Sequence, residues 1–165
     1  FQMVPCAVAD FACGVATWTA GTTDADKLLE AARKTQMAER VRIAAKHVVI
    51  VDDESQFREI LRKELKQLGF AHIDEASGGE ELFRLLQSQT PDLIVLDIYM
   101  PGMNGYEVIG RLKAHTPTAN IPVLILSGRD VDSSELHKKS PTTAIRVLVK
   151  PLGLDALNNH VSYLL

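Results

Sequence analysis

One stretch of the chain, residues 92–105, limits the possible folds more than any other. Leu93 to Leu96 is an unbroken apolar run, which favours a strand covered by helices on both faces over a strand with one wet side. Residues 101–105 include a proline, two glycines and an asparagine, so they break the strand and make a turn. Asp97 is therefore expected at the carboxyl end of a central strand, where open α/β sheets bind their ligands.

Three other apolar runs also end in polar residues. They are residues 48–51, followed by Asp52 and Asp53; residues 121–126, followed by Ser127; and residues 145–149, followed by Lys150. The carboxyl ends of neighbouring parallel strands meet at one edge of a sheet. We therefore expect these side chains to converge with Asp97 at a single site.

Segments with helical periodicity alternate with the strands. The expected helices are residues 55–68, a helix that opens at Gly78–Leu82 after a strand at 71–75, residues 106–114, a short polar helix at 132–139, and residues 154–165. Ser55 is expected to cap the first helix and Gly69 to end it. This alternation predicts right-handed crossovers and a parallel sheet with helices on both faces.

Length and composition exclude several classes of protein. A chain of 165 residues suits one domain with an appendage or two small units. A net charge of -3 argues against direct nucleic-acid binding by charge. No apolar run approaches the roughly 20 residues of a membrane-spanning helix, and no secretory leader is evident. Cys6 and Cys13 have no Cys or His partner at metal-ligand spacing, and we expect two buried free thiols in a cytoplasmic protein, with a disulfide as the less favoured alternative.

The first 46 residues are expected to form an extension ahead of the main domain. Residues 1–22 are small and apolar, and are compatible with one or two short strands. Residues 25 to about 46 mix apolar positions with lysine, arginine and glutamate, which predicts a long amphipathic helix. The main domain is then expected over residues 47–165.

Acidic residues dominate the expected site. Asp52, Asp53 and Asp97 would repel one another at one sheet edge unless a cation joined them. Carboxylate oxygens suit Mg²⁺, which binds through a few carboxylates, waters and a phosphate group. An acidic pair alone is more often a solvated turn, but convergence with Asp97 and Lys150 favours the metal site.

Residues 47 to 165 resemble the receiver domain of two-component response regulators. The residues that carry the resemblance are the pair Asp52–Asp53, Asp97 with the tail Met100–Gly105, Ser127, and Lys150–Pro151. The resemblance implies a flavodoxin-like, doubly wound sheet of five parallel strands in the order 2-1-3-4-5. It also implies that Asp97 accepts a phosphoryl group from a histidine kinase or phosphotransfer protein.

The same resemblance implies a role for each site residue. Asp97 acts as the nucleophile, Lys150 pairs with a phosphoryl oxygen, and Ser127 donates a hydrogen bond to another. Mg²⁺ is held by a set that comprises Asp52, Asp53, Asp97 and Tyr99. Tyr99 and Arg129 flank the phosphoryl site, where their bulk is expected to slow hydrolysis, and the Lys150–Pro151 peptide is expected to be cis.

One position departs from the family pattern. Family members signal through an aromatic residue on the last strand, which rotates inward after phosphorylation. Val147 occupies that position in this sequence, and a valine has no side chain that could swing in this way. The aromatic switch is therefore not expected, and the face formed by residues 132–139, 145–149 and 154–165 must respond by another route.

A fainter resemblance covers the extension. Residues 11–16 and 25–40 are similar to the closing strand and last helix of GGDEF domains, with Arg33 where that family has Asp and Met37 where it has Tyr. A helical linker or dimerisation stalk is the alternative, and it leaves a homodimer possible. Gly78–Leu82 resembles a GGEEF signature, but a helix start with two glutamates in its first turn explains it.

Three functions follow from these features. The first is a phosphorylatable switch rather than a turnover enzyme, with any effector upstream or in a separate partner. The second is a phosphatase or phosphotransferase with an aspartyl nucleophile; the haloacid-dehalogenase pattern argues against it, because it needs an aspartate where Tyr99 stands. The third is a non-phosphorylated pseudo-receiver attached to a degenerate diguanylate cyclase, which works by protein contact.

Overall fold

The structure is a computed structural model that describes residues 25–128, 131, 145–151 and 153–165. The strands expected within residues 1–22, the helix expected at 132–139, and Arg129 lie outside the described residues. The chain divides into two compact units, residues 1–43 and residues 44–165. Each unit is described by itself below.

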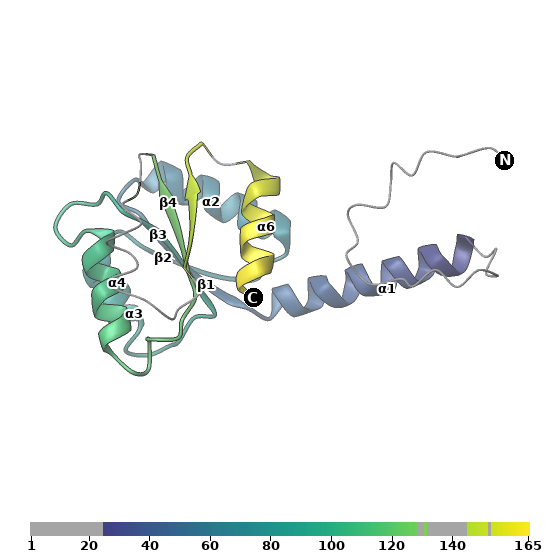
Figure 1. Cartoon of the computed structure of the whole chain (residues 1–165), viewed down its shortest axis with the longest axis horizontal. Helices are drawn as coiled ribbons and strands as arrows, with labels where there is room; N and C mark the ends of the chain where they lie inside the picture. The colour runs from purple at the N-terminus through teal and green to yellow at the C-terminus, as the bar shows by residue number, and fades with distance from the viewer. Residues whose placement is uncertain (1–24, 129–130, 132–144, 152) are drawn as a thin grey trace. The chain divides into compact units, whose positions relative to one another are not determined.

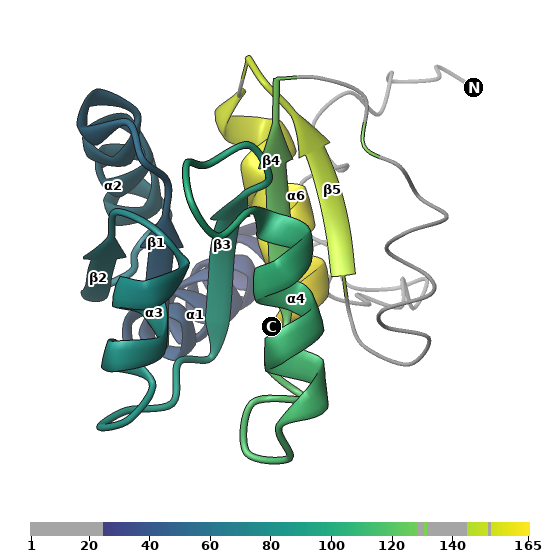
Figure 2. The same ribbon diagram turned by 90° about the vertical axis from the view of Figure 1, so that its left-hand side faces the viewer.

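The second unit is built on a five-stranded parallel sheet of order β2-β1-β3-β4-β5. Its strands are β1 (His47–Val51), β2 (His72–Ala76), β3 (Leu93–Asp97), β4 (Val123–Ser127) and β5 (Ile145–Val149). The helices are α2 (Ser55–Leu68), α3 (Gly79–Leu85), α4 (Gly105–Ala114) and α6 (Leu154–Leu164). Helices α2 and α6 cover one face of the sheet and α3 and α4 the other (Figures 1 and 2). The doubly wound fold and its strand order are confirmed.

The three central strands lie in the core, where residues of the covering helices pack against them. Every side chain of β3 and β4, and every side chain of β1 after His47, is buried. Burying one large aliphatic side chain stabilises a fold by roughly 1.5–3 kcal/mol, so these runs supply a large part of the driving force. The outer strands β2 and β5 are only partly buried. The residues at the carboxyl ends of the central strands are therefore attached to the most buried part of the sheet.

Helix ends follow the sequence pattern with one correction. Gly69 ends α2 in the left-handed conformation, with φ of 108°, as expected for a glycine C-cap. Ser55 was predicted to cap this helix, and that is wrong: Glu54 occupies the N-cap position without a side-chain cap. The carboxylate of Asp52 accepts a hydrogen bond from the Glu54 N–H at 2.8 Å. A residue of the acidic site thus satisfies a donor close to the start of the helix.

Helix α3 begins at the segment that resembles a GGEEF signature. Glu80 and Glu81 lie in its first turn, where the positive end of the helix dipole favours them. Glu81 also accepts hydrogen bonds from the N–H and hydroxyl of Ser77, at 2.7 and 2.6 Å. The helix-start interpretation of this segment is confirmed.

Helix α4 is fixed to the end of β3 at its first turn. Asn104 and Glu107 form a capping box, in which each side chain accepts a hydrogen bond from the other residue's N–H. Gly105 lies so close to β3 that an added Cβ would be 2.6 Å from the carbonyl oxygen of Asp97 and 2.7 Å from the Cα of Ile98. The loop after Asp97 therefore requires a glycine at this position.

All but the last residue of helix α1 (Ala25–Ala44) belongs to the first unit, and the helix is close to the one expected over residues 25 to about 46. Four of its larger apolar side chains are exposed: Leu28, Leu29, Met37 and Val41. The GGDEF resemblance of this segment stays a prediction. Among the described residues, no helix combines the length and apolar character needed to cross a membrane.

Lys113 on α4 gives the fold a testable pH dependence. Its ammonium donates hydrogen bonds to the carbonyls of Ala119 and Ile121 at 2.9 and 2.8 Å, and burial lowers the pKa of Lys113 from 10.5 to about 8. Between these two values the unfolded chain binds more protons than the folded chain. The contribution of Lys113 to the free energy of unfolding therefore increases as the pH rises through this window.

The comparison is between the wild-type chain and Lys113→Arg, because a guanidinium keeps its charge throughout this range. Urea unfolding at pH 8 and pH 10 is expected to show the wild type gaining stability relative to the variant as the pH rises. A stability difference that stays constant between the two pH values would contradict the assigned shift.

Candidate functional site

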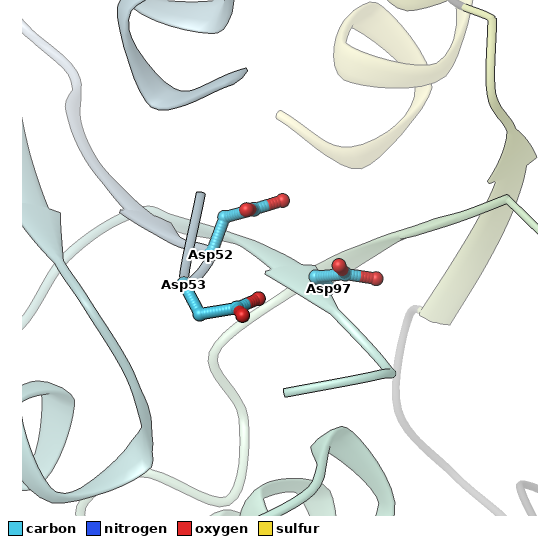
Figure 3. Close-up of side chains that lie close together, drawn as sticks. All are labelled: Asp52, Asp53 and Asp97. Carbon is cyan, nitrogen blue, oxygen red and sulfur yellow. The ribbon is translucent and has the colours of Figure 1, made fainter. Parts of the chain in front are cut away.

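Three carboxylates meet at the carboxyl edge of the central strands. Asp52 and Asp53 directly follow β1, and Asp97 is the last residue of β3. Oxygen atoms of the three side chains lie within 4.8 Å of one another (Figure 3). Asp52 and Asp97 are buried, whereas Asp53 is exposed. An all-oxygen donor set of this kind fits a hard divalent cation such as Mg²⁺.

The ammonium of Lys150 reaches this cluster from the end of β5. Its Nζ lies 2.9 Å from Asp52 Oδ2 and 3.2 Å from Asp97 Oδ2. It also lies 3.7 Å from the centroid of the Phe57 ring on α2, a cation–π contact. The Lys150–Pro151 peptide is cis, as predicted. The chain therefore brings together the acidic pair, Asp97 and Lys150 from three different strand ends.

Burial controls the electrostatics of Asp52. This residue is 1% exposed, and burial raises the pKa of its carboxyl above the ordinary value of 3.8. The charge of Asp97 acts in the same direction, while hydrogen bonds from Lys150 and the Glu54 N–H, together with the Lys150 charge, act against it. A cation bound beside Asp52 would therefore relieve an unfavourable charge as well as gain a ligand.

Ser127 lies at the same edge, between the strands of Asp97 and Lys150. It is the last residue of β4 and is fully buried. Its carbonyl accepts a hydrogen bond from the Lys150 N–H at 2.8 Å. Because β4 pairs with both β3 and β5, the position of Ser127 agrees with the predicted site. The role of its hydroxyl stays a prediction.

Tyr99 follows Asp97 by two residues in the loop after β3. It is 47% exposed, and its backbone N–H lies 3.4 Å from Asp97 Oδ1. The predicted role of Tyr99 as a metal ligand therefore stays a prediction.

Val147 on β5 is partly buried and packs against the core. The expectation that this domain signals without the aromatic switch, because a valine stands at that position, stays a prediction.

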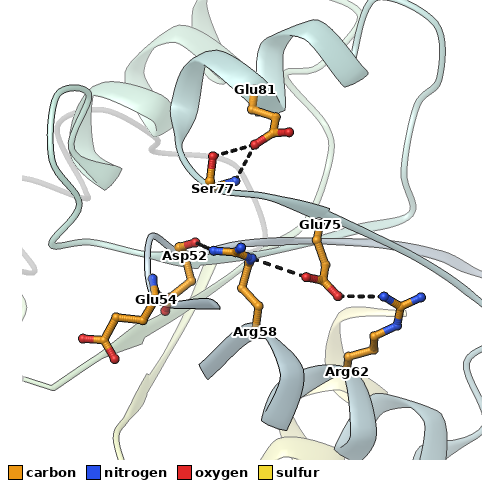
Figure 4. A network of polar contacts seen from close by, with 7 residues as sticks. All are labelled: Asp52, Glu54, Arg58, Arg62, Glu75, Ser77 and Glu81. Carbon is orange, nitrogen blue, oxygen red and sulfur yellow. Dashed lines mark hydrogen bonds and ion pairs between the residues drawn. The ribbon is translucent and has the colours of Figure 1, made fainter. Parts of the chain in front are cut away.

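Sequence reasoning missed the second layer of contacts. The ring of Phe57 on α2 lies against the Lys150 ammonium, a contact that helical periodicity alone does not reveal. Arg58 donates a hydrogen bond to the carbonyl oxygen of Asp52 at 2.6 Å and pairs with Glu75 on β2 (Figure 4). No local pattern gives such partners, because they lie 6 and 17 residues from Arg58. The Asn104–Glu107 box could have been found from its Asn-x-x-Glu spacing.

A parallel sheet of this order with an acidic carboxyl edge defines a flavodoxin-like α/β domain. Residues 48–162 match the response regulator receiver domain, so the chain belongs to this family. The resemblance inferred from Asp52–Asp53, Asp97, Ser127 and Lys150 is thereby confirmed at the level of the family.

Individual relatives agree with this assignment. The phosphate regulon transcriptional regulatory protein PhoB of Rhizobium meliloti is 32% identical over 118 residues, which is 72% of this chain and 51% of PhoB. The response regulator TrrA of Thermotoga maritima, in complex with Mg²⁺ and BeF, is 34% identical with a TM-score of 0.64, over 73% of this chain and 99% of TrrA. The receiver domain of a histidine kinase from Syntrophus aciditrophicus is 30% identical with a TM-score of 0.63, over 73% of this chain and 89% of that one.

The chain spans about half or less of the length of the curated relatives it matches first, with 51%, 29% and 46% of their residues covered. Those relatives include two transcriptional or response regulators and a protein-glutamate methylesterase. The similarity therefore concerns only part of each of these relatives.

Charge repulsion in the cluster can be measured through Asp53. Replacing Asp53 with Asn removes one of three neighbouring negative charges, so we expect the melting temperature to rise by a few degrees in a chelating buffer. With Mg²⁺ in excess, we expect the wild type to gain more than the variant, because ligand binding stabilises the folded state.

The matched control for this experiment is Glu54→Gln. Glu54 is the next residue, is also exposed, and its side chain does not belong to the carboxylate cluster. Thermal unfolding of all three proteins with and without Mg²⁺ makes the comparison. Equal responses of Asp53→Asn and Glu54→Gln would show that the cluster has no special electrostatic role.

Proposed function

We propose that this chain is a phosphorylatable receiver domain whose Asp97 accepts a phosphoryl group, with Mg²⁺ bound beside it, and that the modification changes its protein contacts. The donor is a phosphohistidine on a sensor kinase or phosphotransfer protein, and the site of action is the cytoplasm. One observation carries the proposal: the Lys150 ammonium lies 3.2 Å from Asp97 at an edge where three carboxylates meet. If the acidic residues only formed a solvated turn, no lysine from another strand would be required beside them.

The chemistry requires alignment and charge neutralisation more than covalent assistance. An oxygen of the Asp97 carboxylate attacks phosphorus, the new O–P bond forms as the P–N bond to the donor imidazole breaks, and the imidazole nitrogen keeps the electron pair. Bound Mg²⁺ would supply positive charge to the phosphoryl oxygens, held by Asp52, Asp53 and Asp97.

The chain's own residues supply the remaining interactions. Lys150, which already pairs with Asp97, carries a compact positive charge that can form an ion pair with a phosphoryl oxygen. The Ser127 hydroxyl, at the end of the neighbouring strand, can donate to another oxygen. Asp52 keeps the hydrogen bond from the Glu54 N–H, so its carboxylate stays oriented. The TrrA complex with Mg²⁺ and BeF supports a magnesium site in this family.

The direct test is phosphorylation with a small donor. The wild-type chain, incubated with Mg²⁺ and acetyl phosphate, is expected to gain one phosphoryl group as acetate leaves, and Asp97→Asn is expected to gain none. Intact mass spectrometry measures the stoichiometry, and a chelator should abolish the reaction.

Two other outcomes would replace the proposal. Release of many equivalents of phosphate per chain without accumulation of the phosphoprotein would identify an aspartyl phosphatase. Failure of the wild type to react with acetyl phosphate or to bind beryllofluoride, while it remains folded, would identify a pseudo-receiver that works by contact alone.

The side chain of Tyr99 is expected to prolong the phosphorylated state. It lies two residues beyond Asp97, where its bulk can limit the approach of water to the acyl phosphate. Tyr99→Ala is therefore expected to shorten the half-life of the phosphoprotein several-fold, while Tyr99→Phe keeps it near the wild-type value. Loss of the phosphoryl group is followed by mass spectrometry after removal of the donor. An unchanged half-life in Tyr99→Ala would exclude this role.

A further inference from the structure

We propose that Arg58 is a positioning residue for the acidic pair: it holds the peptide group that joins Asp52 to Asp53 and thereby sets the direction of both carboxylates. This inference rests on the proposed function, because the pair matters as a cation site. The Arg58 Nη1 atom lies 2.6 Å from the carbonyl oxygen of Asp52. That oxygen belongs to the peptide between the two aspartates.

Arg58 is itself held from the opposite side by Glu75 on β2. The Nε atom of Arg58 lies 3.3 Å from one carboxylate oxygen of Glu75, and Arg62 Nη1 lies 2.9 Å from the other. The Arg58 side chain is mostly buried, whereas that of Arg62 is about half exposed. Figure 4 shows Arg58 reaching from α2 between Asp52 and Glu75. A single guanidinium therefore connects α2, the end of β1 and the edge strand β2.

The other contacts of Asp52 explain why its carbonyl matters. Its N–H donates to Ala76 at 3.2 Å, and its carboxylate accepts hydrogen bonds from Glu54 N–H and Lys150. Asp53 is exposed, so its direction depends strongly on the backbone that precedes it. Rotation of the shared peptide would turn Asp53 away from Asp97, and the three carboxylates would no longer share one cation.

A role of Arg58 through its charge and a role through positioning predict opposite effects of its replacement on Mg²⁺ affinity. Arg58 carries a positive charge near the site, so its charge alone would weaken the binding of a cation. Removal of the charge by itself should therefore leave Mg²⁺ binding unchanged or make it tighter. A positioning residue should show the reverse, because its loss disorders the ligands.

The chain provides a matched pair for the experiment. Arg58→Gln and Arg62→Gln each remove one positive charge and one ion pair with Glu75. Only Arg58 also donates a hydrogen bond to the Asp52 carbonyl. Isothermal titration of the full chain with MgCl₂ is expected to give about tenfold weaker binding for Arg58→Gln, the effect of one lost charge-assisted hydrogen bond. Arg62→Gln is expected to bind like the wild type or slightly more tightly.

Two further measurements separate positioning from loss of stability. Amide NMR spectra of the metal-free chain should show changed shifts at Asp53 and Glu54 in Arg58→Gln and not in Arg62→Gln. Arg58→Lys should restore part of the affinity, because an ammonium can reach one of the two acceptors but does not have the fork that spans both. Should Arg58→Gln fail to fold, Arg58→Lys itself is the test: Mg²⁺ binding weaker than in the wild type supports the positioning role, and binding as tight as in the wild type overturns it.

The outcomes distinguish this inference from the proposed function. Wild-type binding of Mg²⁺ with equal or tighter binding by Arg58→Gln would overturn the positioning role and leave the proposed function standing. Equal weakening in Arg58→Gln and Arg62→Gln would also overturn it, since the effect would then follow Glu75 or overall stability. A folded wild-type chain that binds no Mg²⁺ would overturn the metal site and this inference together.

Discussion

The ion pairs of Lys150 with Asp52 and Asp97 are the constraint on which the rest of the site depends. Two buried carboxylates and a third exposed one lie at one edge, and an uncompensated buried charge is strongly destabilising. The compensating ammonium comes from the far end of the sheet, beyond β4. The strand order, the buried end of β4 and the Phe57 ring all keep that ammonium over the carboxylates.

Much of the fold was predictable because its signals are local. Apolar runs fully buried by helices on both faces gave the central strands, and Gly69 marked a helix end through its left-handed backbone. Strand β4 begins two residues later than the apolar run from Ile121 suggests, because Pro122 lacks the N–H that a ladder needs. The site residues Asp52, Asp53, Asp97 and Lys150 were predictable because parallel strands bring their carboxyl ends together.

Partners distant in sequence were not predictable from local pattern. The contacts of Arg58 with Glu75 and of Phe57 with Lys150 depend on how α2 lies against the strand ends. Ser55 was mistaken for a cap because serine is common at the start of a helix, yet the N–H of Glu54 near this helix start donates its hydrogen bond to the carboxylate of the site residue Asp52. In α1, the apolar positions correctly indicated a helix, but the pattern did not show that Leu28, Leu29, Met37 and Val41 would be exposed.

The absence of a side chain at Gly105 has a mechanical consequence. The first turn of α4 rests directly on the backbone of Asp97 and Ile98, with no flexible group between them to absorb a displacement. The Asn104–Glu107 box ties that turn to the loop as well. Any shift of the main chain at Asp97 and Ile98 is therefore expected to displace the first turn of α4.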